Sequence, residues 1–126
     1  MMQESPPSTP PRLRLRLYFG EQLMLGPGKA ELLAALREKG SISAAGRALG
    51  MSYKRAWMLI EEMNAAFKAP VVLSSRGGPG GGGAQLTPLG EEVLAQYGRL
   101  MEKIRSAGAP EIAALAALLR KEEGQP

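Results

Sequence analysis

The chain has 126 residues, a formal net charge of +4, and no Cys or His; Asp is also absent, so every acidic side chain is a Glu. This length suits one modest domain. The composition excludes disulfides, thiolate nucleophiles, Cys/His zinc sites and histidine-based triads. The paired carboxylates at 61–62 and 91–92 carry no sign of a pocket. We therefore expect neither an enzyme nor a cofactor.

The positive charge is concentrated in the middle of the chain, where residues 41–88 contain five basic and two acidic side chains. Such an excess suits a polyanionic partner, although a basic soluble surface explains it equally well. Residues 1–11 lack the basic and apolar regions of a signal peptide, and no apolar run of about 20 residues could span a membrane. We expect a soluble, cytoplasmic protein.

After a Pro/Ser-rich tail at 1–11, residues 12–19 alternate Arg with Leu, which predicts a half-buried strand. Its arginines could contact phosphates, but they could equally protect the edge of a sheet. Three helices are then predicted over 30–39, from Ser41 or Ser43 to Leu49, and over 53–67, with Gly40, Gly50 and Ser52 as boundary residues.

The second and third predicted helices have the layout of a helix-turn-helix. At 100° per residue, one side of the third helix collects core residues, namely Ala56, Leu59, Ile60, Met63 and Phe67. We predict that Lys54, Arg55 and Met58 contact base edges and that Ser52 and Tyr53 contact phosphates. The rings of Tyr53 and Trp57 are expected to serve in packing rather than as platforms for base stacking. The alternative is an ordinary solvated amphipathic helix.

A glycine-rich run follows, at 77–83, between two short predicted strands at 71–73 and 84–86. A nucleotide-binding loop would need a Lys and a Ser or Thr directly after the glycines, and these are missing. A flexible linker is one alternative, but the position favours the wing of a winged helix. We expect Arg76 to contact phosphate or the minor groove, and six glycines to let the backbone approach DNA: Gly77, Gly78, Gly80, Gly81, Gly82 and Gly83.

A long helix is predicted from Thr87 to about Ser106, and Gly108 and Pro110 separate it from a final helix over 111–121. The apolar stripe of these helices is wider than a small core needs, which predicts a homodimer interface. The final helix could instead fold back to complete a monomer. The interface residues would be Leu89, Val93, Tyr97, Leu100, Met101, Ile104, Ile112, Leu115 and Leu119.

The stretch SISAAGRALGMSYKRAWMLIEEMN (41–64), together with the glycine-rich wing and its exit (77–90), resembles the DNA-binding domain of ModE-type molybdate-responsive regulators. These are themselves similar to the LysR-type winged helix. The resemblance covers about residues 12–106. It implies a mainly α winged helix-turn-helix with a small β wing, which dimerises through helices outside the DNA-reading unit and binds double-stranded DNA at a palindromic promoter site.

This resemblance divides the chain into a DNA-binding domain at 12–88, dimerisation helices at 89–121 and a short tail at 122–126. Full-length family members also carry oxyanion-binding domains, for which residues 107–126 are too few. We therefore expect no direct molybdate binding, even in a regulator of molybdenum metabolism. A protein-interaction module that no longer reads DNA is the remaining alternative, because the net charge is modest and the third helix carries Glu61 and Glu62.

Overall fold

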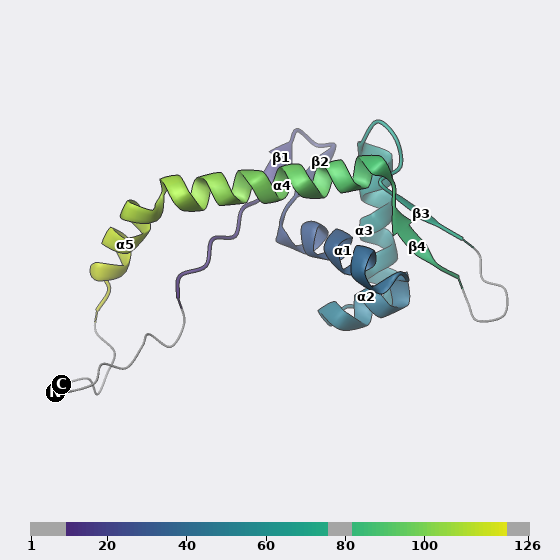
Figure 1. The fold of residues 1–126 in the computed structure, drawn as a ribbon, viewed down its shortest axis with the longest axis horizontal. Coiled ribbons are helices and arrows are strands. Elements are labelled where there is room, and N and C mark those ends of the chain that lie inside the picture. Colours follow the sequence, from purple (N-terminus) through teal and green to yellow (C-terminus); the bar gives the residue numbers. More distant parts are fainter. Residues whose placement is uncertain (1–9, 76–81, 121–126) are drawn as a thin grey trace.

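The computed structural model describes residues 10–75 and 82–120 (Figure 1). It is mainly helical with two small β-hairpins, as the sequence predicts. The elements follow in the order β1 (Leu17–Phe19), β2 (Leu23–Leu25), α1 (Pro27–Lys39), α2 (Ile42–Leu49), α3 (Tyr53–Ala66), β3 (Val72–Ser74), β4 (Ala84–Leu86), α4 (Pro88–Ala107) and α5 (Ala109–Ala117).

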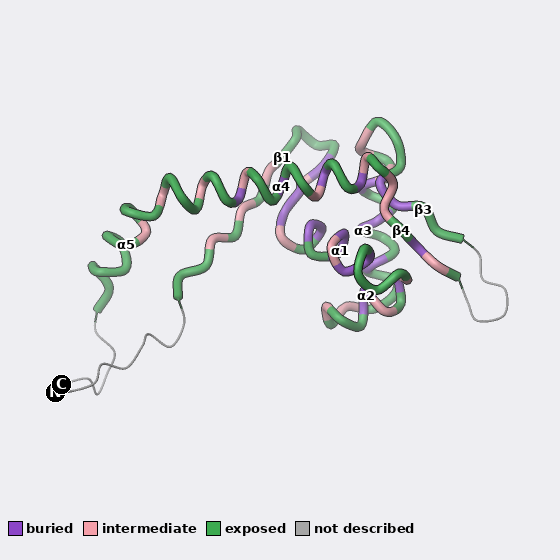
Figure 2. The backbone as a smooth tube through the Cα atoms, in the orientation of Figure 1, coloured by how far each residue is buried: buried purple, intermediate pink, exposed green. Residues whose placement is uncertain are grey.

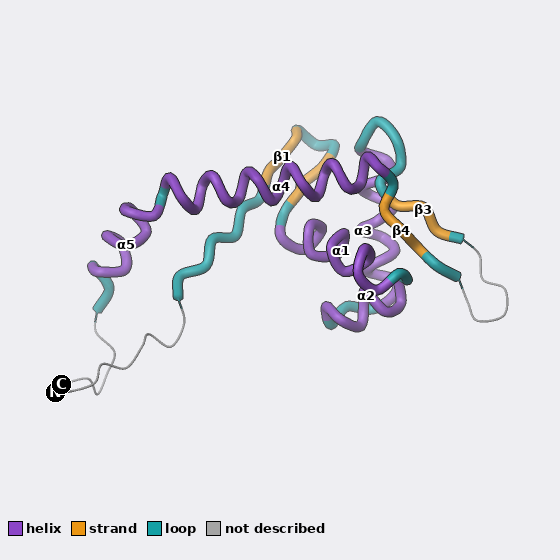
Figure 3. The backbone as a smooth tube through the Cα atoms, in the orientation of Figure 1, coloured by secondary structure: helices purple, strands orange, loops and turns teal. Residues whose placement is uncertain are grey.

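The two hairpins lie apart from each other on the helical body (Figure 3). In the first, β1 pairs antiparallel with β2, with Leu17 opposite Leu25. The strand predicted over residues 12–19 is wrong for residues 12–16, which are extended but unpaired, because β2 is only three residues long. The predicted alternation still holds, since Leu13 and Leu15 are half-buried against the core.

Side-chain caps explain where three of the helices begin. Ser41, Ser52 and Thr87 each accept a hydrogen bond from the backbone N–H three residues later, at 3.0–3.1 Å. These caps satisfy N–H groups that lack partners within the helix. Gly40 and Gly50 end α1 and α2 in the left-handed region, at φ values of 81° and 70°. The predicted boundaries of the central helices are therefore confirmed to within a few residues.

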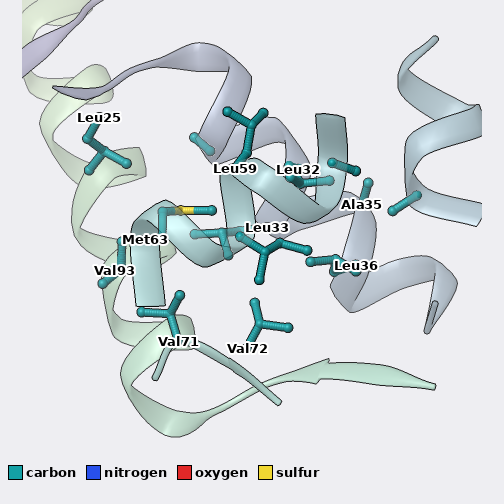
Figure 4. Close-up of a cluster of buried hydrophobic side chains, with 14 of the residues drawn as sticks. Leu25, Leu32, Leu33, Ala35, Leu36, Leu59, Met63, Val71, Val72 and Val93 are labelled. Atoms are coloured by element: carbon teal, nitrogen blue, oxygen red, sulfur yellow. The ribbon is translucent and has the colours of Figure 1, made fainter. Parts of the chain in front are cut away.

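The core forms around α1. Its apolar side chains meet those of α3 and those of Val71, just before β3, and Val72, the first residue of β3 (Figure 4). Five large side chains are fully buried: Leu32, Leu33, Leu36, Met63 and Val71. Gly90 in the first turn of α4 lies directly against Val71, where a Cβ atom would collide with the Val71 carbonyl oxygen. This close approach fixes the start of α4 against the body.

The last part of the chain is much less buried. The second half of α4 extends beyond the helical body and leads into α5, which contains no buried residue (Figures 1 and 2). The prediction that Pro110 separates the two helices is wrong, because Pro110 lies in the first turn of α5, where its missing N–H costs nothing. Gly108 alone separates them. None of the described helices is both long and apolar enough to cross a membrane.

Candidate nucleic-acid interface

Helices α2 and α3 are held together by a tight turn. The N–H of Met51 donates to the carbonyl of Gly46 at 2.9 Å. A Cβ atom on Gly46 would lie 3.0 Å from the Met51 carbonyl oxygen, so a larger residue would push the turn away from α2. Ala45, one residue earlier, is fully buried. The small residues of α2 thus bring the two helices into close contact, as a helix-turn-helix requires.

Helix α3 has one buried face and one exposed face. Four of the predicted core residues, Ala56, Leu59, Ile60 and Met63, are buried, and Phe67 is half-buried just after the helix ends. The exposed face carries the residues predicted to meet DNA: Ser52, Tyr53, Lys54, Arg55 and Met58.

The prediction that Tyr53 and Trp57 are packing residues is wrong, because neither side chain is buried. Their side chains are 55% and 45% exposed. They are four residues apart, so they share one side of α3, and this side faces the second hairpin rather than the core. The interior beside α3 is already filled by α1 and by Val71 and Val72, which leaves no room for two further aromatic rings.

The charged side chains near α3 differ in whether they form ion pairs. Glu62 pairs at 3.1 Å with the ammonium group of Lys29, which is almost completely buried at the start of α1. Within residues 10–75 and 82–120, the exposed cations Arg47, Lys54 and Arg55 form no ion pair. The first turn of α3 therefore presents free positive charge, while one of the two acids further along the helix is neutralised. Neither Lys29 nor Arg47 had been singled out from the sequence.

The second hairpin lies beside α3. Strand β3 pairs antiparallel with β4, with Val72 opposite Leu86, and the N–H of Ser75 extends the ladder by donating to the Gly83 carbonyl at 2.9 Å. The N–H of Ala84 donates to the carbonyl of Gly40, which ties the hairpin to the turn between α1 and α2. Gly82 is exposed and Gly83 is half-buried at its base. Arg76 and Gly77, Gly78, Gly80 and Gly81 lie outside the described residues.

Asn64, which the sequence analysis did not identify, fastens this hairpin to α3. Its side-chain oxygen accepts from the N–H groups of Val71 and Val72 at 2.7 and 3.2 Å, and its amide nitrogen donates to the Val72 carbonyl at 3.2 Å. Thr87 adds a second link, because its hydroxyl donates to the carbonyl of Pro70 at 2.7 Å. These bonds fix the position of the wing relative to the recognition helix.

The residues predicted to form a dimer interface fall into separate groups. Val93, Tyr97 and Met101 are buried in the core of this chain. The hydroxyl of Tyr97 donates to the Leu15 carbonyl at 2.7 Å, and burial, the largest influence, raises its pKa. The half-buried residues are Leu89, Leu100, Ile104 and Ile112, whereas Leu115 and Leu119 are exposed.

A helix-turn-helix with an exposed basic recognition helix, followed by a β-hairpin wing and a long helix, defines a winged helix-turn-helix DNA-binding domain. Residues 28–91 match the family of bacterial regulatory helix-turn-helix proteins of the lysR family. The chain belongs to this family, which is one of regulators rather than enzymes.

Several proteins that are similar to this chain over the same region have names that refer to molybdenum or to ModE. The molybdenum-pterin-binding protein MopB of Rhodobacter capsulatus is 50% identical over 76 residues, which cover 60% of this chain and 28% of the relative. The DNA-binding transcriptional dual regulator ModE of Escherichia coli K12 is 38% identical over 88 residues, covering 70% and 34%. The transcriptional regulator ModE of Yersinia pestis is 39% identical over 83 residues, covering 66% and 32%. The chain thus spans about a third of the length of these relatives.

Proposed function

We propose that this chain binds specific sites in double-stranded DNA by placing the first turn of α3 in the major groove. The observation that carries the proposal is the set of free, exposed side chains on that turn, because Lys54 and Arg55 have no acidic partner among the described residues. The ammonium group of Lys54 and the guanidinium group of Arg55 can donate to base edges, and the apolar side chain of Met58 can contact a thymine methyl group.

Other residues of the same face would position the protein on the DNA backbone. Ser52 and Tyr53 carry exposed hydroxyl groups at the start of α3. Arg76 and the glycines at 77–83 would bring the wing close to the minor groove and its phosphates. The hydrogen bonds of Asn64 support this arrangement, because they hold the wing at a constant spacing from α3.

We propose further that the protein acts as a homodimer on a palindromic promoter site. The end of α4, helix α5 and the residues directly after it expose apolar side chains that a second copy could cover, among them Leu115 and Leu119 at 65% and 74% exposure. Two-fold pairing is the commonest arrangement of soluble homo-oligomers. It presents two recognition helices about one turn of DNA apart, or a multiple of that spacing.

The names of the relatives refer to molybdenum and to the regulator ModE, which supports a role for this chain in regulating molybdenum-related genes. Direct molybdate binding by this chain is not expected. Among the described residues the only buried charged side chain is Lys29, and its charge is already paired with Glu62. The described part of the winged helix-turn-helix therefore contains no unpaired buried cation for an oxyanion.

In vitro selection of bound duplexes from a random pool tests this proposal, because it reports DNA binding, palindromy and half-site spacing together. On the selected site, Lys54→Ala should relax the preference at one base position, with a loss of about 1–3 kcal/mol. Arg76→Ala should weaken binding to all sequences and reduce the salt dependence by about one counterion. Lys68→Ala removes an exposed charge beyond α3 and serves as the control. Failure to enrich any duplex would favour a protein-interaction module.

A further inference from the structure

A hollow of about 660 Å³ lies between the recognition helix and the base of the wing. One side is formed by the start of α2, another by the wing, and the floor by the side of α3 that faces the wing. Its lining includes two aromatic side chains, Tyr53 and Trp57, and four serine side chains, Ser41, Ser43, Ser74 and Ser75.

The described lining of this hollow contains no charged side chain, although the exposed cations of α3 lie close by in the sequence. Ser75 accepts a hydrogen bond from the Gly83 N–H at 3.3 Å, so its hydroxyl proton is left to be donated elsewhere. Ser43 is exposed on the opposite side and forms no side-chain hydrogen bond within the described part of the chain. The hollow thus combines hydroxyl donors on two sides with an apolar, aromatic floor.

The occupant follows from where the hollow lies, and this step rests on the proposed function. When α3 enters the major groove and the wing lies beside the adjacent minor groove, the backbone strand that separates the two grooves passes between them. A phosphate in that strand offers acceptors to the hydroxyl groups, and a deoxyribose offers an apolar face to the rings.

We propose that this hollow, whose described lining carries no charge, binds one sugar-phosphate step of the DNA backbone. Trp57 packs against the deoxyribose with Tyr53 beside it, and Ser43 and Ser75 donate hydrogen bonds to the phosphate. Because these four residues are uncharged, their contacts strengthen binding to every sequence without releasing counterions. Losing this contact should therefore lower the affinity for all sequences alike, unlike the loss of a base contact. It should leave the salt dependence unchanged, unlike the loss of a Lys or Arg that contacts a phosphate.

The test compares Trp57→Ala with Phe19→Ala, a matched control that removes an aromatic side chain of similar exposure, 49%, from β1, outside the described lining of the hollow. On the duplex that the wild-type chain selects and on a random duplex alike, Trp57→Ala should weaken binding about fivefold. The slope of log K against log salt should stay at its wild-type value. Trp57→Phe, which keeps a ring, should restore most of the affinity, and Ser43→Ala should cause a similar uniform loss.

Single 2′-O-methyl nucleotides placed along the selected duplex then locate the contact. The wild-type chain should lose affinity at one step in each half-site. This loss should disappear in Trp57→Ala and persist in Phe19→Ala. The inference is overturned if no step shows this coupling, or if Trp57→Ala instead removes sensitivity to replacing a thymine by uracil, which would identify base reading. A wild-type chain that binds no duplex would overturn the proposed function itself, and this inference with it.

Discussion

Helices α3 and α5 both expose large apolar side chains, but for different reasons. Four residues of α3 are buried in the core, so the helix is held in place while Trp57 and Met58 remain 45% and 48% exposed. Helix α5 has no buried residue, and Leu118 is 80% exposed. A helix of nine residues is marginal in water without packing. Helix α3 thus exposes apolar side chains while its other face is anchored in the core, whereas α5 exposes apolar side chains without any such anchor among its own residues.

The boundary between the two regions lies within α4. Its first half shares the core through Val93 and Tyr97, and Met101 is its last buried residue. Beyond that point Ile104 is half-buried, and none of the described residues that follow is buried. The domain boundary that the sequence predicts at residues 88–89 therefore runs through the packed body, which continues as far as Met101.

The sharpest test of this comparison removes one large side chain from each region. Leu33→Ala empties a fully buried position and should reduce the free energy of unfolding by about 2–5 kcal/mol. Leu118→Ala removes a side chain that is 80% exposed and should leave the unfolding of the monomer unchanged. Urea denaturation at low protein concentration measures both. Equal losses would show that α5 is part of the same core.

A charge placed directly after α5 should separate self-association from folding. Leu119→Glu should dissociate the dimer, because it places a carboxylate in the proposed apolar interface, and Leu100→Glu should act in the same way at the end of α4. Sedimentation equilibrium at tens of micromolar protein measures this change. A wild-type chain that remains at 13.4 kDa under these conditions would contradict the dimer.

Within the DNA-reading region, Asn64→Ala tests whether the wing depends on α3. The change leaves two backbone N–H groups without their side-chain acceptor and should reduce the free energy of unfolding by about 1–3 kcal/mol. DNA affinity should fall further than the stability loss explains, and footprinting should lose the minor-groove protection first. Asn64→Gln, one methylene longer, is the control for the amide group itself. Unchanged minor-groove protection would show that the wing is positioned without the hydrogen bonds of Asn64.

The smallest effect concerns Tyr97, which joins the first half of α4 to the extended segment at Leu15. Burial raises the pKa of its hydroxyl, so the folded state prefers the neutral phenol. Its contribution to stability should be complete below the unfolded pKa of about 10 and should be lost as the pH rises through the higher folded pKa. Tyr97→Phe should cost about 1 kcal/mol at neutral pH. The loss of stability above pH about 10 should be shallower in this variant than in the wild type.

Local signals in the sequence predicted the central fold well. Ser41, Ser52 and Thr87 mark helix starts because a capping side chain acts on the backbone three residues away. The buried face of α3 follows from the 3.6-residue period in the same way. Strand β2 was not predicted. Its three residues, Leu-Met-Leu, are all apolar, so they lack the alternation that would distinguish a strand from the helix that follows.

The sequence by itself determined the helix-turn-helix, the two wing strands and the basic first turn of α3, since each depends on residues within a few positions of one another. Only the tertiary structure decided that Trp57 faces outward, that Asn64 holds the wing, and that the α4 stripe is shared between the core and the region beyond it. An apolar side chain looks the same in the sequence whichever surface it meets. Its role depends on which distant segments already fill the space beside it, as Val71 and Val72 do beside α3.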